Sequence, residues 1–100
     1  MPNYDSELEL FPAELGNSFN SASRYAREAL EDGEFISWAE IGFGIARKKG
    51  RSWEAARDYF RASDSVLRSL QLVYFMHWAQ AGNSLAEESP IMASGYFKSS

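Results

Sequence analysis

Two stretches of this 100-residue chain are versions of one another, and the internal repeat limits the fold more than any other feature. The motif W-A-x-x-G occupies residues 38–42 and returns 40 positions later at 78–82. A second motif, A-x-x-Y-F-x-x-S, occupies residues 56–63 and returns at 93–100, only 37 positions on. Repeats of this length are typical of stacked arrays, in which one unit cannot bury its apolar face alone. We therefore expect a helical-repeat protein that works by presenting a surface.

Composition excludes several classes of protein. Hydrophobic residues make up 45% of the chain and aromatic residues 15%, which is enough for a core and argues against disorder. The absence of cysteine excludes disulfides and thiolate metal sites, and it fits a reducing cytoplasm, the expected location. No apolar run approaches the ~20 residues of a membrane span, and the N-terminus lacks the features of a secretory signal. The net charge of −4 argues against nucleic-acid binding. Neither a nucleic acid nor a membrane is expected as a partner.

Hydrophobic periodicity of 3.6 predicts five helices. They are expected over about 19–32, 35–49, from Ser52 onward, from about 75 to 87, and from Ser89 to the chain end, with Gly33 and Gly50 as stop signals. Residues 1–18 are expected to form an arm or cap, because Pro12 marks a boundary and residues 15–18 weaken a helix. A turn at 64–65, a short helical piece over 66–71 and a bend should join the repeats at 35–74 and 75–100, the second of which looks truncated.

The first motif is similar to the first helix of a tetratricopeptide repeat, W-x-x-L-G-x-x-Y, and Ala56 and Phe60 match the A-x-x-x-F of its second helix. The period of 40 differs from the family's 34, and the proline after the second helix is missing. A second resemblance is to repeats of large bacterial proteins that carry a von Willebrand A domain. The tetratricopeptide resemblance implies an all-α fold, a short right-handed array of antiparallel helical hairpins over residues 19–100. Both motif tryptophans should then be buried in equivalent sites, with Gly42 and Gly82 at close helix contacts.

Catalytic groups do not form a recognisable constellation in this sequence. His77 is the only histidine, and one imidazole without cysteine cannot build a metal site unless carboxylates assist. Glu28, Glu31, Asp32 and Glu34 could supply an acid–base pair, but a solvated surface explains them better. No G-x-S-x-G motif or phosphate loop is present. We expect no enzyme activity and no cofactor.

The favoured function is therefore a non-catalytic protein–protein interaction module that holds a peptide or partner protein in a groove. The candidate groove residues lie on the first helix of each repeat: Glu40, Phe43, Arg47, Gln80, Asn83 and Ser84. The basic residues Arg47, Lys48, Lys49 and Arg51 could hold an acidic peptide or a phosphate, although a charged helix end explains them too. Trp53, Tyr74 and Phe75 are candidates for an exposed patch. The alternative function is a structural scaffold or a self-associating fragment of a larger protein, with no ligand groove of its own, which could form a homo-oligomer.

Overall fold

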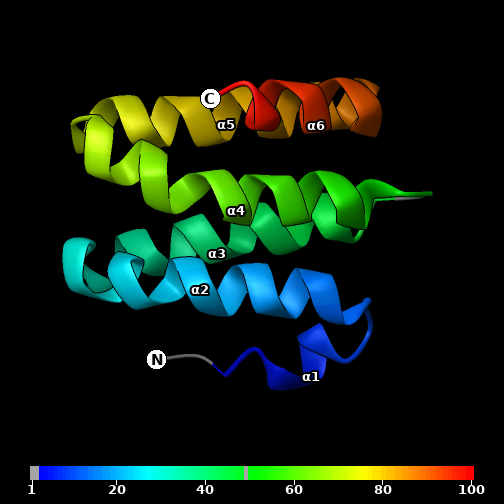
Figure 1. The fold of residues 1–100 in the computed structure, drawn as a ribbon, viewed down its shortest axis with the longest axis horizontal. Helices are drawn as coiled ribbons and strands as arrows, with labels where there is room; N and C mark the ends of the chain where they lie inside the picture. The colour runs from blue at the N-terminus through cyan, green and yellow to red at the C-terminus, as the bar shows by residue number, and fades with distance from the viewer. Residues whose placement is uncertain (1–2, 49) are drawn as a thin grey trace.

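The computed structural model describes residues 3–48 and 50–100, which fold into six helices joined by turns (Figure 1). The helices are α1 (Asp5–Leu8), α2 (Ala13–Ala29), α3 (Asp32–Ala46), α4 (Ser52–Ser69), α5 (Leu72–Glu88) and α6 (Pro90–Lys98). No strand occurs among these residues, so the expected all-α class is confirmed.

The helices form two layers, with α4 at the centre of the molecule. In one layer α4 packs between α2 and α6, and in the other α3 packs against α5. The layers are joined by the contacts of α3 with α4, of α4 with α5 and of α5 with α6. Figure 1 shows the order along the long stack, with the short α1 beside α2 at one end and the α5–α6 hairpin at the other. Successive helices from α2 to α6 therefore alternate between the two layers.

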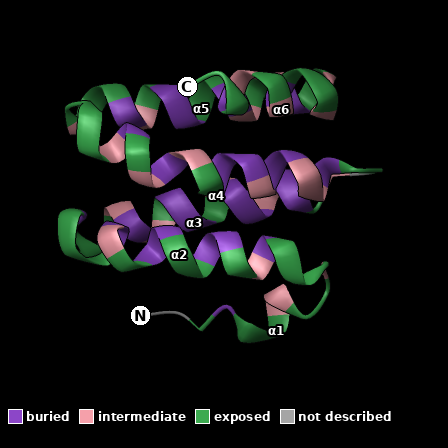
Figure 2. Ribbon diagram, viewed as in Figure 1, coloured by how far each residue is buried: buried purple, intermediate pink, exposed green. Residues whose placement is uncertain are grey.

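Figure 2 shows buried residues gathered on the central helices α3 and α4. Both motif tryptophans are buried in matching sites, as the repeat predicts. The Trp38 ring meets Phe60 edge-on at 5.2 Å between centroids and 72°, and Trp78 meets Phe97 at 5.2 Å and 71°. Each indole N–H also donates a hydrogen bond to the serine three residues after its phenylalanine, at 2.9 Å in the first hairpin and 2.7 Å in the second. The sequence repeat is therefore a repeat of contacts.

Gly42 and Gly82 lie where two helices meet closely, which confirms the expectation of close helix contacts at the motif glycines. A Cβ atom added to Gly42 would stand 2.1 Å from the ring of Phe60, and one added to Gly82 would stand 2.0 Å from the ring of Phe97. Both glycines lie inside helices, α3 and α5, without positive φ angles. Each phenylalanine ring therefore occupies the space that the missing side chain leaves.

The start of α2 differs from the sequence-based expectation. The helix begins at Ala13, so the prediction that residues 15–18 weaken a helix is wrong, whereas Pro12 does mark the boundary as the residue before the first turn. Leu15 is fully buried, and its packing outweighs the low helix propensity of Gly16 next to it. The helix ends at Leu30, whose backbone is extended, and not at Gly33, which lies in the first turn of α3.

The expected turn at residues 64–65 is also wrong, because α4 runs without a break to Ser69. Asp64 accepts a hydrogen bond from Arg68 one turn later at 2.6 Å, and Val66 is buried, so this segment gains from staying helical. The break comes instead at Leu70 and Gln71, and α5 already begins at Leu72. The long apolar stretch thus divides between the end of α4 and the start of α5.

The structural repeat reaches further toward the N-terminus than the sequence motifs do. Both α2 and α4 end in an extended leucine, Leu30 and Leu70, which stand 40 positions apart. With the same spacing, Phe19 stacks on Trp38 at 5.7 Å and 18°, and Tyr59 stacks on Trp78 at 5.6 Å and 18°. Helix α2 is therefore the counterpart of α4, and it crosses the boundary expected between residues 18 and 19.

Tyr59 links the two hairpins, and its burial predicts an alkaline effect on stability. Its hydroxyl donates a 2.8 Å hydrogen bond to the Trp38 carbonyl, and burial raises the pKa of the phenol well above its ordinary value of 10.0. The unfolded chain then releases this proton first, so stability is unaffected by Tyr59 below pH 10 and falls above it by about 1.4 kcal/mol per pH unit. Urea titrations between pH 9 and 11.5 should show this slope reduced in Tyr59→Phe. Equal slopes in the two proteins would contradict it.

Candidate partner-binding cleft

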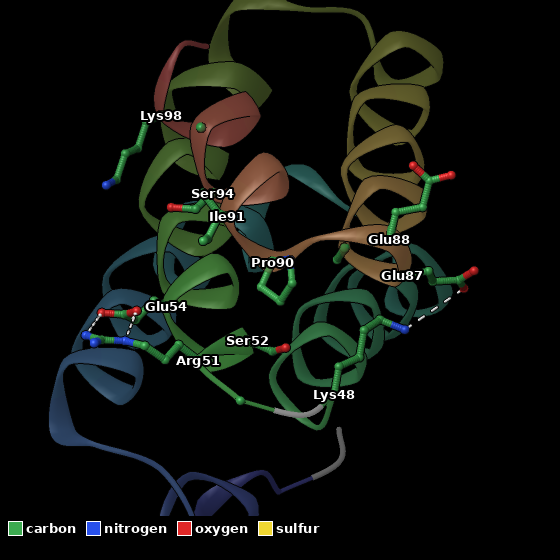
Figure 3. A pocket seen from close by; sticks show the side chains of 13 residues that line it. Lys48, Arg51, Ser52, Glu54, Glu87, Glu88, Pro90, Ile91, Ser94 and Lys98 are labelled. Carbon is green, nitrogen blue, oxygen red and sulfur yellow. Dashed lines mark hydrogen bonds and ion pairs between the residues drawn. The ribbon is translucent and has the colours of Figure 1, made fainter.

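A cleft of about 950 Å³ opens where the end of the α3–α4 hairpin meets the turn between α5 and α6 (Figure 3). We call it the junction cleft. Residues of four segments line it: Lys48, Gly50, Arg51, Ser52, Glu54, Ala86, Glu87, Glu88, Pro90, Ile91, Ser94, Gly95 and Lys98. In Figure 3 Pro90 stands near the middle, between Lys48 on one side and Arg51 on the other.

The two hairpins turn differently beside the cleft. Residues 47–51 separate α3 from α4, and Gly50 within them has a φ of 71°, a left-handed conformation that favours glycine. In the second hairpin Ser89 alone separates α5 from α6. Its side chain accepts a hydrogen bond from the Met92 backbone N–H at 3.2 Å, and Pro90 takes the first helical position. The second turn is thus four residues shorter than the first.

Small side chains deepen the cleft. Ala86 from α5 and Gly95 from α6 line it together with Ser52 and Ser94. A Cβ atom added to Gly95 would meet nothing within 4 Å, so the space beside it is open. Ile91 is 85% exposed and is the most exposed of the large apolar side chains in the described residues. A ligand in the cleft would therefore find apolar surface in Ile91 and Pro90 and room beside Gly95.

Each of the three cations in the described lining of the cleft forms an ion pair with a carboxylate of the chain. Arg51 binds Glu54 at 2.6 Å, and Lys48 lies 4.0 Å from Glu87 on the opposite side (Figure 3). The pairing with Glu54 raises the pKa of Arg51, and the hydrogen bond from Arg51 lowers the pKa of the Glu54 carboxyl. The described lining holds three cations and three carboxylates, so it carries no net charge.

A buried carboxylate, Asp58, holds α6 against α4 beside the cleft. Its oxygens accept a short hydrogen bond from the Ser94 hydroxyl and one from Arg57 at 3.2 Å, while Lys98 lies 3.9 Å away. The Asp58 side chain is only 2% exposed, and these cationic and hydroxyl partners compensate for its loss of hydration. Arg57 also reaches Glu14 of α2 at 3.1 Å. This network fixes the helices that line the cleft, and we assign it a structural role.

Of the site residues predicted from the sequence, only those of the basic segment 47–51 border the cleft. Lys48 and Arg51 line it, whereas Arg47 turns toward the N-terminus, where it binds Glu7 at 2.6 Å and lies 3.7 Å from Glu40. Lys49 lies outside the described residues. Every described member of the segment is thus paired with a carboxylate of the chain, which is the arrangement expected of a charged helix end and not of an open anion site.

The expected groove residues on α3 and α5 lie apart from the cleft lining. Glu40, Gln80 and Ser84 are exposed on the surface and Asn83 is half-buried. The prediction for Phe43 is wrong: its ring is fully buried and stacks on the ring of Tyr4 at 5.0 Å. The periodicity placed Phe43 outside the core because it omitted the N-terminal segment that covers it.

The other singled-out aromatics divide three ways. Tyr74 is 58% exposed, as expected, whereas Phe75 is fully buried against Trp78, so its prediction as a surface residue is wrong. Trp53 is half-buried, with the guanidinium of Arg57 over its ring at 5.4 Å. Tyr74 and Phe75 are neighbours in α5, so their side chains point in different directions. The long apolar run gave no signal that shows which of the two faces the core.

The groups considered for catalysis lie on the surface. His77 is exposed on α5, and Glu28, Glu31 and Asp32 are exposed while Glu34 is half-buried. Glu31 and Glu34 form the capping box that begins α3, with a 2.8 Å hydrogen bond from the Glu31 N–H to the Glu34 side chain. Within residues 3–48 and 50–100, no group of three or more histidine or acidic residues is arranged to hold a metal ion.

Most residues of the cleft carry no motif that marks them in the sequence. Ala86, Ile91 and Gly95 received no functional interpretation, although the Ser89-Pro90 start of α6 was expected. The available signal was the difference between the two repeat spacings, 40 and 37 positions, which placed three missing residues in this turn.

No family model, curated protein or solved structure matches the chain. None of the described helices is long and apolar enough to cross a membrane.

Proposed function

We propose that this chain is a tetratricopeptide-like interaction module that binds a segment of a partner protein in the junction cleft and has no catalytic activity. The observation that carries the proposal is the cleft itself. It is open, and it lies where the turns of two helical hairpins meet. Binding pockets commonly combine an apolar lining with a few polar groups that orient the ligand, and this lining has both.

The charges of the cleft favour an apolar segment over a strongly acidic one. Lys48 and Arg51 already have carboxylate partners, so an acidic peptide would have to compete with Glu87 and Glu54 for them. Apolar contact with Ala86, Pro90 and Ile91 meets no such competition. We therefore assign recognition to these apolar side chains and a steering role to the charged rim.

A peptide selection tests this proposal. A random 12-residue library displayed on phage is selected against the immobilised protein, and the recovered peptides are synthesised and titrated by calorimetry. Gly95→Leu should weaken binding by at least about tenfold, because its side chain enters the cleft. Gly33→Leu is the matched control, since a Cβ there also meets nothing within 4 Å and Gly33 lies on α3 away from the cleft lining. Peptides that bind the wild type and Gly95→Leu equally would refute the proposal.

Self-association is the second candidate function, and the outer face of α6 favours it. Met92 stands 37 positions after Ala55, as Phe97 stands after Phe60, yet Met92 is 54% exposed and Ala55 is fully buried. Tyr96 likewise corresponds to the buried Tyr59 but is half-exposed. In the α3–α4 hairpin this face is covered by α5 and α6. The corresponding face of the α5–α6 hairpin is exposed at Met92 and partly exposed at Tyr96.

Light scattering across a range of protein concentrations measures this association. If copies pair through this face, the mean mass should rise with concentration, and Tyr96→Glu should return it to the monomer value. Tyr74→Glu, which changes an exposed tyrosine on α5, should leave the association unchanged. A monomer mass at every concentration would exclude self-association.

A further inference from the structure

The structure assigns a chemistry to the ligand of the junction cleft: we infer that the cleft receives an uncharged aromatic side chain, of indole size, from the partner segment. This inference rests on the proposed function and goes further, because it names the anchor group. Its basis is that the protein contains a second copy of the same junction, in which aromatic side chains of the chain itself stand at two of the corresponding positions.

The internal copy lies one repeat earlier, between α2 and α4. Each residue that lines the cleft has a counterpart one repeat earlier in the sequence. The counterpart lies 40 positions earlier for lining residues up to the end of α5, and 37 positions earlier for those in α6. Arg51 then corresponds to Phe11, and Pro90 corresponds to Trp53. Phe11 and Trp53 are both partly buried against the core. At the first junction two aromatic rings therefore pack at the positions that Arg51 and Pro90 hold in the cleft.

The first junction also shows how an indole is held at such a site. Arg57 corresponds to Ser94 of the cleft, and its guanidinium lies 5.4 Å from the centre of the Trp53 ring, a cation–π contact. Glu14 then binds the same guanidinium at 3.1 Å. In the junction cleft Glu54 holds the position of Glu14 and binds Arg51. The arginine stands at a different place, because Arg51 corresponds to Phe11 and not to Arg57, and Pro90 stands where the first junction has Trp53. Neither aromatic ring of the first junction therefore has a counterpart in the cleft.

Size and charge agree with an aromatic occupant. At about 950 Å³ the cleft is large enough for an indole together with the neighbouring backbone of a peptide. The described lining has no net charge, so it offers a neutral ring no electrostatic penalty, whereas a charged side chain would meet an ion pair already formed. Arg51 supplies a cation at the edge of the cleft for contact with the face of the ring.

The test uses three blocked amino acids as probes, N-acetyl-tryptophanamide, N-acetyl-leucinamide and N-acetyl-lysinamide, titrated into the ¹⁵N-labelled full chain. We expect the tryptophan probe to shift the amide signals of Ala86, Ile91 and Gly95 with millimolar affinity. The leucine and lysine probes should bind at least about tenfold more weakly. Equal binding of the leucine probe, shifts confined to other residues, or no shift with any probe would each overturn the inference.

Two variants make the result specific to the cleft. Gly95→Leu should abolish the shifts at Ala86 and Ile91, and Gly33→Leu should leave them unchanged, with circular dichroism confirming that both variants fold. The outcome is separable from that of the peptide selection. Selected peptides that Gly95→Leu blocks but that contain no shared aromatic residue would sustain the proposed function and refute the aromatic anchor.

Discussion

Replacing Trp38 by alanine is expected to lower the free energy of unfolding by about 3–5 kcal/mol, the range for removing a large aromatic side chain from a core. The indole is fully buried and packs against four rings, those of Phe19, Phe35, Tyr59 and Phe60, at centroid distances of 5.2 to 6.3 Å. Because these rings come from α2, α3 and α4, the cavity would loosen three helices together. Domains of this size have a total stability of about 5–15 kcal/mol, so the loss removes a large part of it.

Urea unfolding followed by circular dichroism measures this loss without depending on the tryptophan signal. Trp53→Ala is the matched control, because Trp53 is only half-buried and its main polar contact is the cation–π pair with Arg57. We expect it to cost less than half as much as the change at Trp38. The result would count against a shared aromatic core if Trp38→Ala cost less than about 1 kcal/mol.

The tryptophan sites could be predicted from sequence because the repeat supplied two independent copies of one pattern. Two tryptophans in the same W-A-x-x-G context must meet similar neighbours, and the matching contacts with Phe60 and Phe97 follow from that. The same reasoning predicted a helix over most of α2 but did not recognise it as the counterpart of α4. Its phenylalanine at position 19 stands where the next repeat has Tyr59, and no tryptophan or glycine motif precedes it. A repeat can be recognised in the sequence only where the same residue types recur. The packing contact can stay the same when the residue type changes, as with Phe19 and Tyr59.

The cleft was less predictable, because residues from four segments far apart in the sequence line it. Sequence motifs report residues that are present, such as the basic segment, and its charge suggested an anion site. The structure instead brings carboxylates to Lys48 and Arg51 from α5 and α4. The acidic partners could not be assigned beforehand, since Glu87 lies 39 positions from Lys48 and only the stacking of α3 on α5 makes them neighbours.

Glycine substitutions at two positions of α3 should change stability in opposite directions. Gly42→Ala should lower the free energy of unfolding by about 1–3 kcal/mol, because the new methyl group would stand 2.1 Å from the Phe60 ring. Phe60 cannot yield easily, since its fully buried ring is surrounded by those of Phe19, Trp38, Phe43 and Tyr59. This overlap outweighs the gain of about 1 kcal/mol in helix propensity that alanine brings over glycine.

Gly44→Ala isolates the propensity gain, because a Cβ atom at Gly44 meets nothing within 4 Å and the residue lies in the same helix without a positive φ. We expect this variant to gain up to about 1 kcal/mol, measured in the same urea titrations as Gly42→Ala. The difference in sign within one helix separates helix propensity from close packing. If Gly42→Ala were stabilising as well, the Phe60 ring would have room to move, and the glycine of the W-A-x-x-G motif would not be explained by the contact between α3 and α4.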